Sequence, residues 1–397
     1  MAEDRRSRNK RRRVNNTRKR RRKKSGGRTP FAVAVAILVV ASLIVVGIVL
    51  LTKYRKYTGY NVNASLKMNN ADNNSQFRVY GDGYMKCADD GVTYFTSDRV
   101  VWNESHSMIR PIFDVNGDYI AVSDITGKAV MLYDRSGYAG KVDYSGNIMD
   151  VEVTSAGLTG CATDEGNLSY IELKDRKGNE ILTSKSIFSS GGYLMDIELS
   201  DDGSRMAAIY VTVNKGTLRS KVIFYDLSGD GSSSDDIITG TFDGYESIML
   251  TDVKYMKDDT WAVVGDKALA FYKYKDVPEP VYETLDCTWE IQSLFFTDSY
   301  VGMITEEPES ESAYNIRVFD LSGNIVLNKG TEFSFNKADF AGDNVIMYSG
   351  NECLMFSFAG VEKLRYAFPE RIVALVSSDG RHFLYSTASD TEFITLE

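Results

Sequence analysis

The sequence predicts an all-β fold, a β-propeller of seven or eight four-stranded blades, preceded by one transmembrane α-helix and a disordered basic N-terminal tail. Three observations predict it. Basic and apolar residues are segregated in the first 52 positions, short alternating apolar runs fill the chain from Phe77 onward, and two kinds of turn recur among those runs. The expected domains are the tail (1–30), the helix (31–52), a polar Asn-rich stem (53–76) and an extracytoplasmic propeller (77–397).

The N-terminal tail carries a charge opposite to that of the rest of the chain. Residues 1–30 hold 15 of the 46 basic residues and two of the 55 acidic ones, which leaves 31 basic and 53 acidic residues for the remainder. The tail has no aromatic residue to stack on bases, which argues against nucleic acid, and its basic runs favour contact with anionic lipid. Docking of a cytoplasmic protein is the alternative. The lipid and topology candidates are Arg11, Arg12, Arg13, Arg20, Arg21, Arg22, Lys23 and Lys24.

An apolar run follows the tail, with no charged residue from Phe31 to Leu51. A helix of that length spans about 31 Å, close to the hydrocarbon thickness of a bilayer. The run is longer than the roughly 7–15 residues of a signal-peptide core, and no small-residue cleavage site closes it. We therefore expect an uncleaved signal anchor in the cell membrane, a buried core helix being the other interpretation. The excess of Lys and Arg before the run places the N-terminus in the cytoplasm and the large domain outside.

Two turn elements define the repeat. In the first, an apolar residue precedes Asp-x-Ser-Gly or a near variant, in which Asp caps the turn and Gly accepts a positive φ. Its copies begin at Asp134, Asp175, Asp226 and Asp320. The second element follows a short apolar run that we interpret as an inner strand, such as 148–153, 195–199 or 291–296. Its copies lie near Gly117, Gly157, Gly203, Asp259, Ser299, Asp343 and Gly380.

The spacing of the second turn gives the size of the repeat. Successive copies are separated by 37 to 56 residues, which suits four-stranded propeller blades of about 40–50 residues. The segment from Phe77 to Glu104 supplies one more strand group, and the C-terminus supplies three strands without a fourth. A strand from the stem would complete that last blade and give eight, whereas a shared closing blade would give seven. We favour eight, and a β-sandwich is the structural alternative.

The four cysteines are Cys87, Cys161, Cys287 and Cys353. Two disulfides are possible in principle. The repeat assigns the cysteines to four different blades, however, and a disulfide requires a Cα separation of about 4.4–6.8 Å. We therefore expect free thiols, buried in apolar strands.

The chain resembles a known group of proteins. The order of basic tail, helix and Asn-rich stem, followed by Ser107-Met-Ile-Arg-Pro111 and Leu132-Tyr-Asp-Arg-Ser-Gly137, is similar to an uncharacterised family. Its members are single-pass, membrane-anchored propeller-like proteins of Gram-positive, clostridia-like bacteria. The resemblance covers most of the outer domain and rests on turn signals. It implies the fold and the anchor, and it brings no established activity or catalytic residue.

Catalytic constellations are missing from the sequence. The chain has two histidines, His106 and His382, and no G-x-S-x-G motif, which argues against zinc hydrolase and serine hydrolase chemistry. Trp102, Trp261 and Trp289 share no common context, unlike the docking motifs of quinone-dependent propellers. We expect no catalytic residue and no cofactor.

Two loops could bind other partners. Asp226, Ser228 and Asp230 occupy the first, third and fifth places of a calcium loop, but Ile237 replaces the bidentate Glu at the twelfth, so a solvated hairpin is favoured over a metal site. The second loop is acidic. We expect its carboxylates to stay exposed, either as a solvated loop tip or as a docking surface for a basic partner. They are Glu306, Glu307, Glu309 and Glu311.

The function that these features favour is a non-enzymatic, membrane-tethered scaffold that binds another cell-envelope protein. A propeller can equally support an enzyme or a sensor, because the fold does not fix the function. One alternative is an extracellular hydrolase or lyase that uses carboxylates in the central channel, which inward-facing acids with raised pKa values would favour. The other is a ligand sensor that signals through its single helix.

Overall fold

The computed structural model divides the chain into two compact units, Met1–Lys53 and Tyr54–Glu397. It describes residues 29–70, 75–229, 237–285, 287–307 and 310–397. The basic residues proposed for lipid contact, all between Arg11 and Lys24, therefore lie outside the described residues.

The first unit contributes one helix, α1 (Thr29–Tyr54), 26 residues rich in Ala, Val, Ile and Leu. Its side chains are described at 34–45, 47 and 54, and those of 34–45 are exposed. Within the described part of the chain, no helix has the length and apolar character needed to cross a membrane.

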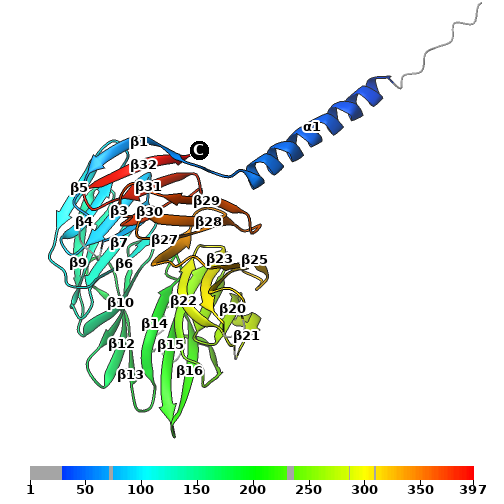
Figure 1. The fold of residues 1–397 in the computed structure, drawn as a ribbon. Coiled ribbons are helices and arrows are strands. Elements are labelled where there is room, and N and C mark those ends of the chain that lie inside the picture. Colours follow the sequence, from blue (N-terminus) through cyan, green and yellow to red (C-terminus); the bar gives the residue numbers. More distant parts are fainter. Residues whose placement is uncertain (1–28, 71–74, 230–236, 286, 308–309) are drawn as a thin grey trace, which may run out of the picture. The chain divides into compact units, whose positions relative to one another are not determined.

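The second unit is an eight-bladed β-propeller, the favoured of the two blade numbers expected from the sequence, and each blade is an antiparallel sheet of four strands (Figure 1). The strands of the first four blades are β2–β5 (Gln76–Tyr80, Gly83–Ala88, Gly91–Phe95, Val100–Ser105), β6–β9 (Pro111–Asn116, Tyr119–Asp124, Ala129–Asp134, Gly137–Asp143), β10–β13 (Asn147–Val153, Thr159–Asp164, Leu168–Lys174, Glu180–Ile187) and β14–β17 (Tyr193–Leu199, Arg205–Asn214, Thr217–Asp226, Ile238–Glu246).

The other four blades follow the same order. Their strands are β18–β21 (Leu250–Met256, Thr260–Gly265, Ala268–Tyr274, Pro278–Thr284), β22–β25 (Glu290–Phe296, Tyr300–Glu306, Tyr314–Asp320, Ile325–Thr331), β26–β29 (Lys337–Phe340, Asn344–Ser349, Glu352–Ser357, Glu362–Ala367) and β30–β32 (Ala374–Val376, His382–Ser386, Asp390–Leu396) joined by β1 (Tyr60–Lys67). First strands of successive blades contact one another between β6 and β10, β10 and β14, β14 and β18, β22 and β26, and β30 and β2.

The topology gives the propeller two distinct faces. The first strand of each blade is the inner one and the fourth is the outer one, so the chain must cross from rim to centre before each new blade. Those crossings and the turn between the second and third strands lie on one face, which we call the linker face. The first and third turns of each blade lie on the opposite face, where β1 also begins.

The ring is closed by the two ends of the propeller. Strand β1 comes from the range expected to be a stem, and it pairs with β32 from Tyr60 opposite Leu396 to Lys67 opposite Asp390. It thereby supplies the fourth strand of the last blade. The ring consequently consists of eight complete four-stranded blades. Asn70, just after β1, is fully buried.

Asn70 connects this closing segment to the C-terminal strands. Its side-chain amide donates hydrogen bonds to Ser386 Oγ (2.8 Å), to the Thr387 carbonyl (3.1 Å) and to Thr391 Oγ1 (3.0 Å). A buried amide of this kind is costly to leave without its partners. Asn70, one residue of the Asn-rich sequence, therefore holds the segment after β1 against the C-terminal strands through buried hydrogen bonds.

The recurring Asp turns have the predicted geometry. Asp134 Oδ1 accepts the backbone N–H of Ser136 at 2.7 Å, and Asp320 Oδ1 accepts that of Ser322 at 2.9 Å. Gly323, which follows, has a φ of 78°. These turns connect the third and fourth strands of their blades, so each one sits on the face opposite the linkers.

Apolar clusters fill the spaces between adjacent blades. The largest joins the β14–β17 and β18–β21 blades around Phe224, Trp261 and Tyr272, all buried. No disulfide joins the four cysteines, as expected, and three of them are buried whereas Cys287 is half-buried. The propeller is thus held by packing and strand pairing.

We expect loss of the Asn70 amide to weaken the closure. Asn70→Ala should lower the free energy of unfolding by about 2–4 kcal/mol, because the buried Ser386 and Thr391 hydroxyls lose a partner. Asn63→Ala is the matched control, since the Asn63 amide also bonds a side chain of β32 but is exposed. Thermal unfolding monitored by circular dichroism should show a clear loss for the first variant and almost none for the second. Equal effects would contradict this role.

Candidate functional site: the central channel

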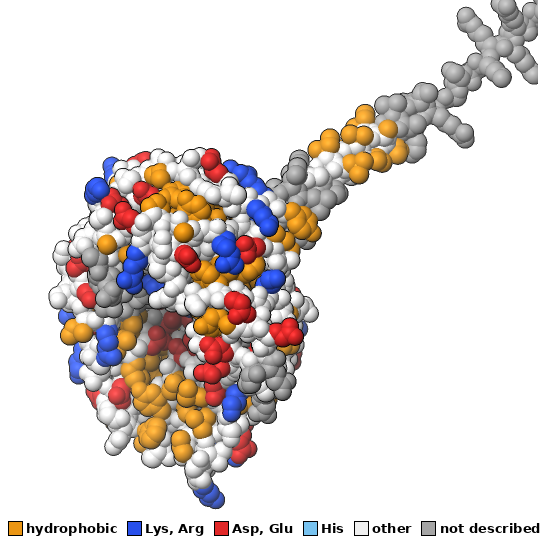
Figure 2. Space-filling view, in the orientation of Figure 1, with side chains coloured by type: hydrophobic (Ala, Val, Ile, Leu, Met, Phe, Trp, Pro, Cys, Tyr) orange, Lys and Arg blue, Asp and Glu red, His pale blue; other side chains and the backbone are white. Residues whose placement is uncertain are grey.

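The centre of the ring encloses a cavity of about 770 Å³. The first strands of seven of the eight blades line it, all but β14. Figure 2 shows a hollow in the middle of the propeller with acidic side chains inside it. A cavity of this size lies in the usual range for small-ligand sites.

Carboxylates on the inner strands connect neighbouring blades. An inner strand is the edge of its sheet, and its N–H groups that point away from the neighbouring strand need hydrogen-bond acceptors. Carboxylates on one inner strand accept these N–H groups from the next inner strand. The pairs of carboxylate and backbone donor are Asp114 with Val153 (2.9 Å), Asp150 with Ile197 (3.5 Å), Asp196 with Val253 (2.7 Å) and Glu198 with Tyr255 (3.0 Å).

Glu152 differs from these four. Its side chain lines the cavity and is 8% exposed, yet it makes no hydrogen bond with any described residue. The nearby Lys254 ammonium donates to Glu198 at 2.7 Å instead. Glu152 is therefore a buried carboxyl that accepts no hydrogen bond from the described residues.

The enclosed position of these groups shifts their protonation. Desolvation raises the pKa of Glu152 well above its usual range, and the charges of Asp114 and Glu198 raise it further. Desolvation likewise raises the pKa of Glu198 to about 7, against the opposing effect of Lys254. The Glu198 carboxyl can therefore exchange a proton near neutral pH, which ordinary surface acids cannot do.

Asp150 and Asp196 form a coupled pair within the same wall. Desolvation raises the pKa of both carboxyls, and the charge of Asp150 adds to the effect on Asp196. A hydrogen bond from Asp196 opposes the shift at Asp150. For Lys254, burial works against the charged form, but Glu152, Glu198 and Asp114 raise its pKa well above the usual value. The wall therefore holds one firmly charged lysine among several acids.

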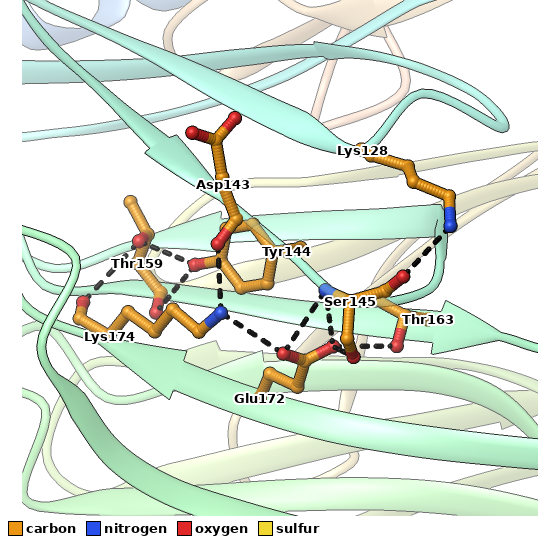
Figure 3. Close-up of polar contacts among 8 residues, drawn as sticks. All are labelled: Lys128, Asp143, Tyr144, Ser145, Thr159, Thr163, Glu172 and Lys174. Atoms are coloured by element: carbon orange, nitrogen blue, oxygen red, sulfur yellow. Dashed lines mark hydrogen bonds and ion pairs between the residues drawn. The ribbon is translucent and has the colours of Figure 1, made fainter.

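A second buried acid, Glu172 on β12, lies outside the channel, and both of its carboxylate oxygens have partners (Figure 3). Its carboxylate accepts the Ser145 hydroxyl (2.7 Å) and the Thr163 hydroxyl (3.0 Å) and pairs with Lys174 (3.1 Å). Although burial opposes ionisation, these hydrogen bonds hold the pKa of Glu172 below its usual value. Lys128 donates to the Ser145 carbonyl, so the network fixes the linker between the second and third blades. Its role is structural.

The acidic loop between β23 and β24 matches the expectation only in part. Glu306 and Glu311 are exposed, but Glu307 is half-buried and forms an ion pair with Arg317. Burial opposes the charge of Glu307, but the hydrogen bond from Arg317 has the larger effect, so the pKa of Glu307 is lowered. The expectation of four exposed carboxylates is therefore wrong for Glu307, because a basic residue on the next strand lies within reach. Glu309 lies outside the described residues.

Two of the residues considered as calcium ligands, Asp226 and Ser228, form hydrogen bonds with each other within the turn. Asp226 Oδ1 accepts both the backbone N–H (2.9 Å) and the hydroxyl (2.5 Å) of Ser228, as in the other copies of this turn. Asp230 lies outside the described residues. Among the residues that are described, no group of three or more His, Cys, Asp or Glu side chains could hold a metal ion.

Sequence reasoning missed the channel carboxylates. Asp150 and Glu152 alternate with apolar residues, which is the pattern of a strand with one solvated face. A signal was available, because Asp-x-Glu recurs in the next blade at Asp196 and Glu198, in the same place within the inner strand. Repetition of an acid at an inner-strand position indicates a shared role in the ring.

A model of DUF5711, a family of unknown function, matches residues 53–396, so the chain belongs to that family. The matched range takes in the whole propeller, β1 included. No curated protein has a significantly similar sequence.

Solved structures with similar folds share little sequence with the chain. Sqt1 from Chaetomium thermophilum is 10% identical with a TM-score of 0.52, and the match covers 85% of this chain and 100% of Sqt1. Hsv2 from Kluyveromyces lactis is 11% identical with a TM-score of 0.48, over 78% of this chain and 100% of Hsv2. At such identities the likeness to Sqt1 shows the fold alone.

We expect the hydrogen bonds and ion pair of Glu172 to contribute several kcal/mol to the free energy of unfolding. Glu172→Gln should lower the free energy of unfolding by about 2–4 kcal/mol, because an amide cannot replace a buried carboxylate that accepts several donors and pairs with Lys174. Glu180→Gln, an exposed position in the same blade, is the control. Chemical denaturation should separate the two variants. A Glu172→Gln protein as stable as the control would rule out the network's structural role.

The channel acids should give the propeller an unusual dependence on pH. Because the pKa of Glu198 is raised in the folded state, its contribution to stability is full below about pH 4.5 and is lost as the pH rises through about 7. Glu152, Asp150 and Asp196 act in the same direction. Lowering the pH from 8 to 5.5 should therefore raise Tm by about 2–5 °C.

Substitution should assign this pH effect. Glu198→Gln is expected to reduce the rise in Tm between pH 8 and 5.5, whereas Glu246→Gln, which removes an exposed carboxylate paired with Arg219, should leave it unchanged. Differential scanning calorimetry at a series of pH values measures both. A Tm that falls steadily from pH 8 to 5.5 in the unsubstituted protein would contradict the raised pKa values.

Proposed function

We propose that this DUF5711 propeller is a non-enzymatic, membrane-tethered scaffold that binds another cell-envelope protein on the outer side of the membrane. One observation carries the binding part of the proposal. Exposed apolar side chains recur in the linkers of four blades. They are Ile109, Phe188, Met249 and Leu285, which are 79%, 49%, 37% and 37% exposed.

The topology supports the linker face as the binding surface. All four residues belong to linkers between a fourth strand and the next first strand, so they lie on the same face. Val213, 64% exposed beside the turn between β15 and β16, lies on that face as well. Exposed apolar side chains that recur on one face of a protein are typical of an interaction site.

Charge defines the kind of partner. The loop between β23 and β24 is on the linker face and exposes Glu306 and Glu311. The chain beyond the tail is strongly acidic, which would steer a basic partner toward it. We therefore propose a partner whose contact surface is apolar with basic residues at its edge.

Membrane tethering rests on the sequence. Residues 31–51 contain no charged side chain, and the tail before them contains 15 basic residues. We propose that this segment is a signal anchor, with the tail at the cytoplasmic leaflet and the propeller outside. The chain enters the propeller on the face opposite the linkers, where Tyr57 and Thr58 bond Lys363 and Glu397 through their backbones.

The binding proposal can be tested by crosslinking in cells with matched variants. Full-length protein tagged at its C-terminus should capture one specific envelope protein. Combined Phe188→Ser, Met249→Ser and Leu285→Ser should abolish that capture, because they remove the apolar contacts of the linker face. The control combines Val277→Ser, Val281→Ser and Ile325→Ser, which are equally exposed but lie on the opposite face or on outer strands.

The outcome separates the possibilities clearly. Capture that survives in the control and is lost in the linker-face variant supports the proposal. Capture that is lost in both variants, or kept in both, excludes the linker face. Quantitative mass spectrometry of the crosslinked material, normalised to the amount of tagged protein, provides the measurement.

A carboxylate-dependent hydrolase is the second candidate. The raised pKa values of Glu152 and Glu198 favour it, because an acid–base catalyst needs a carboxyl that holds a proton near neutral pH. Against it, Asp114, Asp150, Asp196 and Glu198 already bond backbone N–H groups of the next blade. Turnover of a glycan or peptide that disappears in Glu152→Gln would establish the enzyme and exclude the scaffold as the whole function.

A further inference from the structure

The central cavity has ionisable side chains on two opposite walls that form no ion pair with any residue in the described ranges. Its third-blade wall carries Glu152, and its seventh-blade wall carries Lys337 at the start of β26. In a ring of eight blades arranged in chain order, the third and seventh blades face each other across the channel. The two residues therefore approach the cavity from opposite sides.

The acidic side is Glu152. Its side chain is more than nine-tenths buried and lines the cavity, and no described residue donates a hydrogen bond to it. Lys254 is the nearest cation, but its ammonium is bound to Glu198. A buried carboxyl with unused acceptors is costly unless a ligand or a proton satisfies it.

The cationic side consists of Lys337 on β26 of the seventh blade, opposite Glu152, and Arg78 on β2 of the first blade, with the eighth blade between them. Both residues line the cavity and are exposed, and neither forms an ion pair with a described residue. The Arg78 guanidinium donates a hydrogen bond to the Phe77 carbonyl at 3.2 Å and lies over the Phe113 ring. Burial and the positive charge of Arg78 lower the pKa of Lys337, which shows that the two cations influence each other. Asp339, also on this side, accepts the N–H of Phe340, and Arg78 offsets part of its desolvation. Two neighbouring cations directed into one cavity form a site for an anion.

The walls between the two sides are mixed in character. Phe113, Phe295 and Leu375 lie among the cavity residues, so apolar groups could pack between the charged ends. A volume of about 770 Å³ is enough for a molecule of several residues. The ligand that fits this distribution carries opposite charges at its two ends.

We propose that the channel binds a zwitterionic ligand of the size of a short peptide, with its ammonium group at Glu152 and its carboxylate at Arg78 and Lys337. This site is separate from the linker face and goes beyond the scaffold function. A peptide with free ends has the required charges and can span the cavity. A metal ion would not use the cationic wall, and a simple anion would not use Glu152.

The experiment measures binding of four related probes to the purified full-length chain in detergent by isothermal titration calorimetry. The probes are trialanine with free ends, N-acetyl trialanine, trialanine amide, and trialanine blocked at both ends. The zwitterion should bind best, and each single block should weaken binding by about tenfold or more, because each removes one charge-assisted contact.

Three variants assign the ends of the ligand. In Glu152→Gln the N-acetyl block should no longer matter, while the amide block should keep its effect. The double variant Arg78→Gln, Lys337→Gln should show the reverse. The exposed pair Glu246 and Arg219, changed together to Gln, is the control and should bind all probes like the unsubstituted protein. Thermal unfolding of each variant checks that the propeller is folded.

The proposal is overturned if none of the four probes binds, if blocking an end has no effect, or if the variants weaken all probes equally. These results are independent of the crosslinking test, since the linker-face variants leave the channel residues unchanged. Loss of partner capture with retained binding of trialanine would reject the scaffold function and keep the channel site. The opposite pattern would do the reverse.

Discussion

The structure depends on the pairing of β1 with β32. A propeller is a ring of sheets that contact only their neighbours, so its integrity is set by the one junction where the chain's two ends must meet. Here that junction is a fourth strand supplied from the N-terminal side, and the buried Asn70 amide fixes the segment that follows it. The remaining blades are built from strands that are consecutive in the chain.

Closure of the ring also creates the channel and its chemistry. Eight inner strands are brought around one axis, and their edges present backbone N–H groups to a partly dry space. Carboxylates from the preceding blade satisfy several of these groups, as Asp196 does for Val253. Desolvation in this space raises the pKa values of the acids, and the charges of their neighbours raise them further. Glu152 is left without a hydrogen bond from any described residue. The site we propose in the channel is therefore a consequence of how the blades are joined.

The division between the two faces follows from the same topology. Linkers must cross from the rim to the centre, so they cover one face together with the second hairpin turn of each blade, whereas the first and third hairpin turns cover the other. Linkers can carry exposed apolar residues such as Phe188 without disturbing the strands. The hairpin turns are constrained more tightly, because each Asp–Ser pair, such as Asp134 and Ser136, is needed to form the turn. Binding residues are thus most easily accommodated on the linker face.

Local patterns were sufficient to predict the blades but not the site. The Asp turns and the inner strands before the second turn were recognisable because turn chemistry and alternation are short-range signals. The pairing of β1 with β32 was foreseen only as one of two possibilities, since it joins residues more than 300 positions apart. The ion pair of Glu307 with Arg317 was not foreseen, because it depends on which side chains face each other across two strands.

The channel site, likewise, could not be predicted from local sequence patterns. Glu152 occupies an ordinary alternating strand, and its burial arises only when neighbouring blades pack against it. The recurrence of Asp-x-Glu at Asp196 and Glu198 was the one available clue, and it becomes meaningful only when the strands are known to be inner ones.

Hydrogen–deuterium exchange of the full-length protein tests the central claim, closure by β1, most directly. The backbone amides that pair β1 with β32 should exchange as slowly as those that pair the outer strand of another blade with its neighbour, such as β13 with β12, because both are complete antiparallel ladders. The residues just before Tyr57 should exchange quickly. Rapid exchange throughout Tyr60–Lys67, with the other blades protected, would contradict the closure and with it the eight-bladed ring.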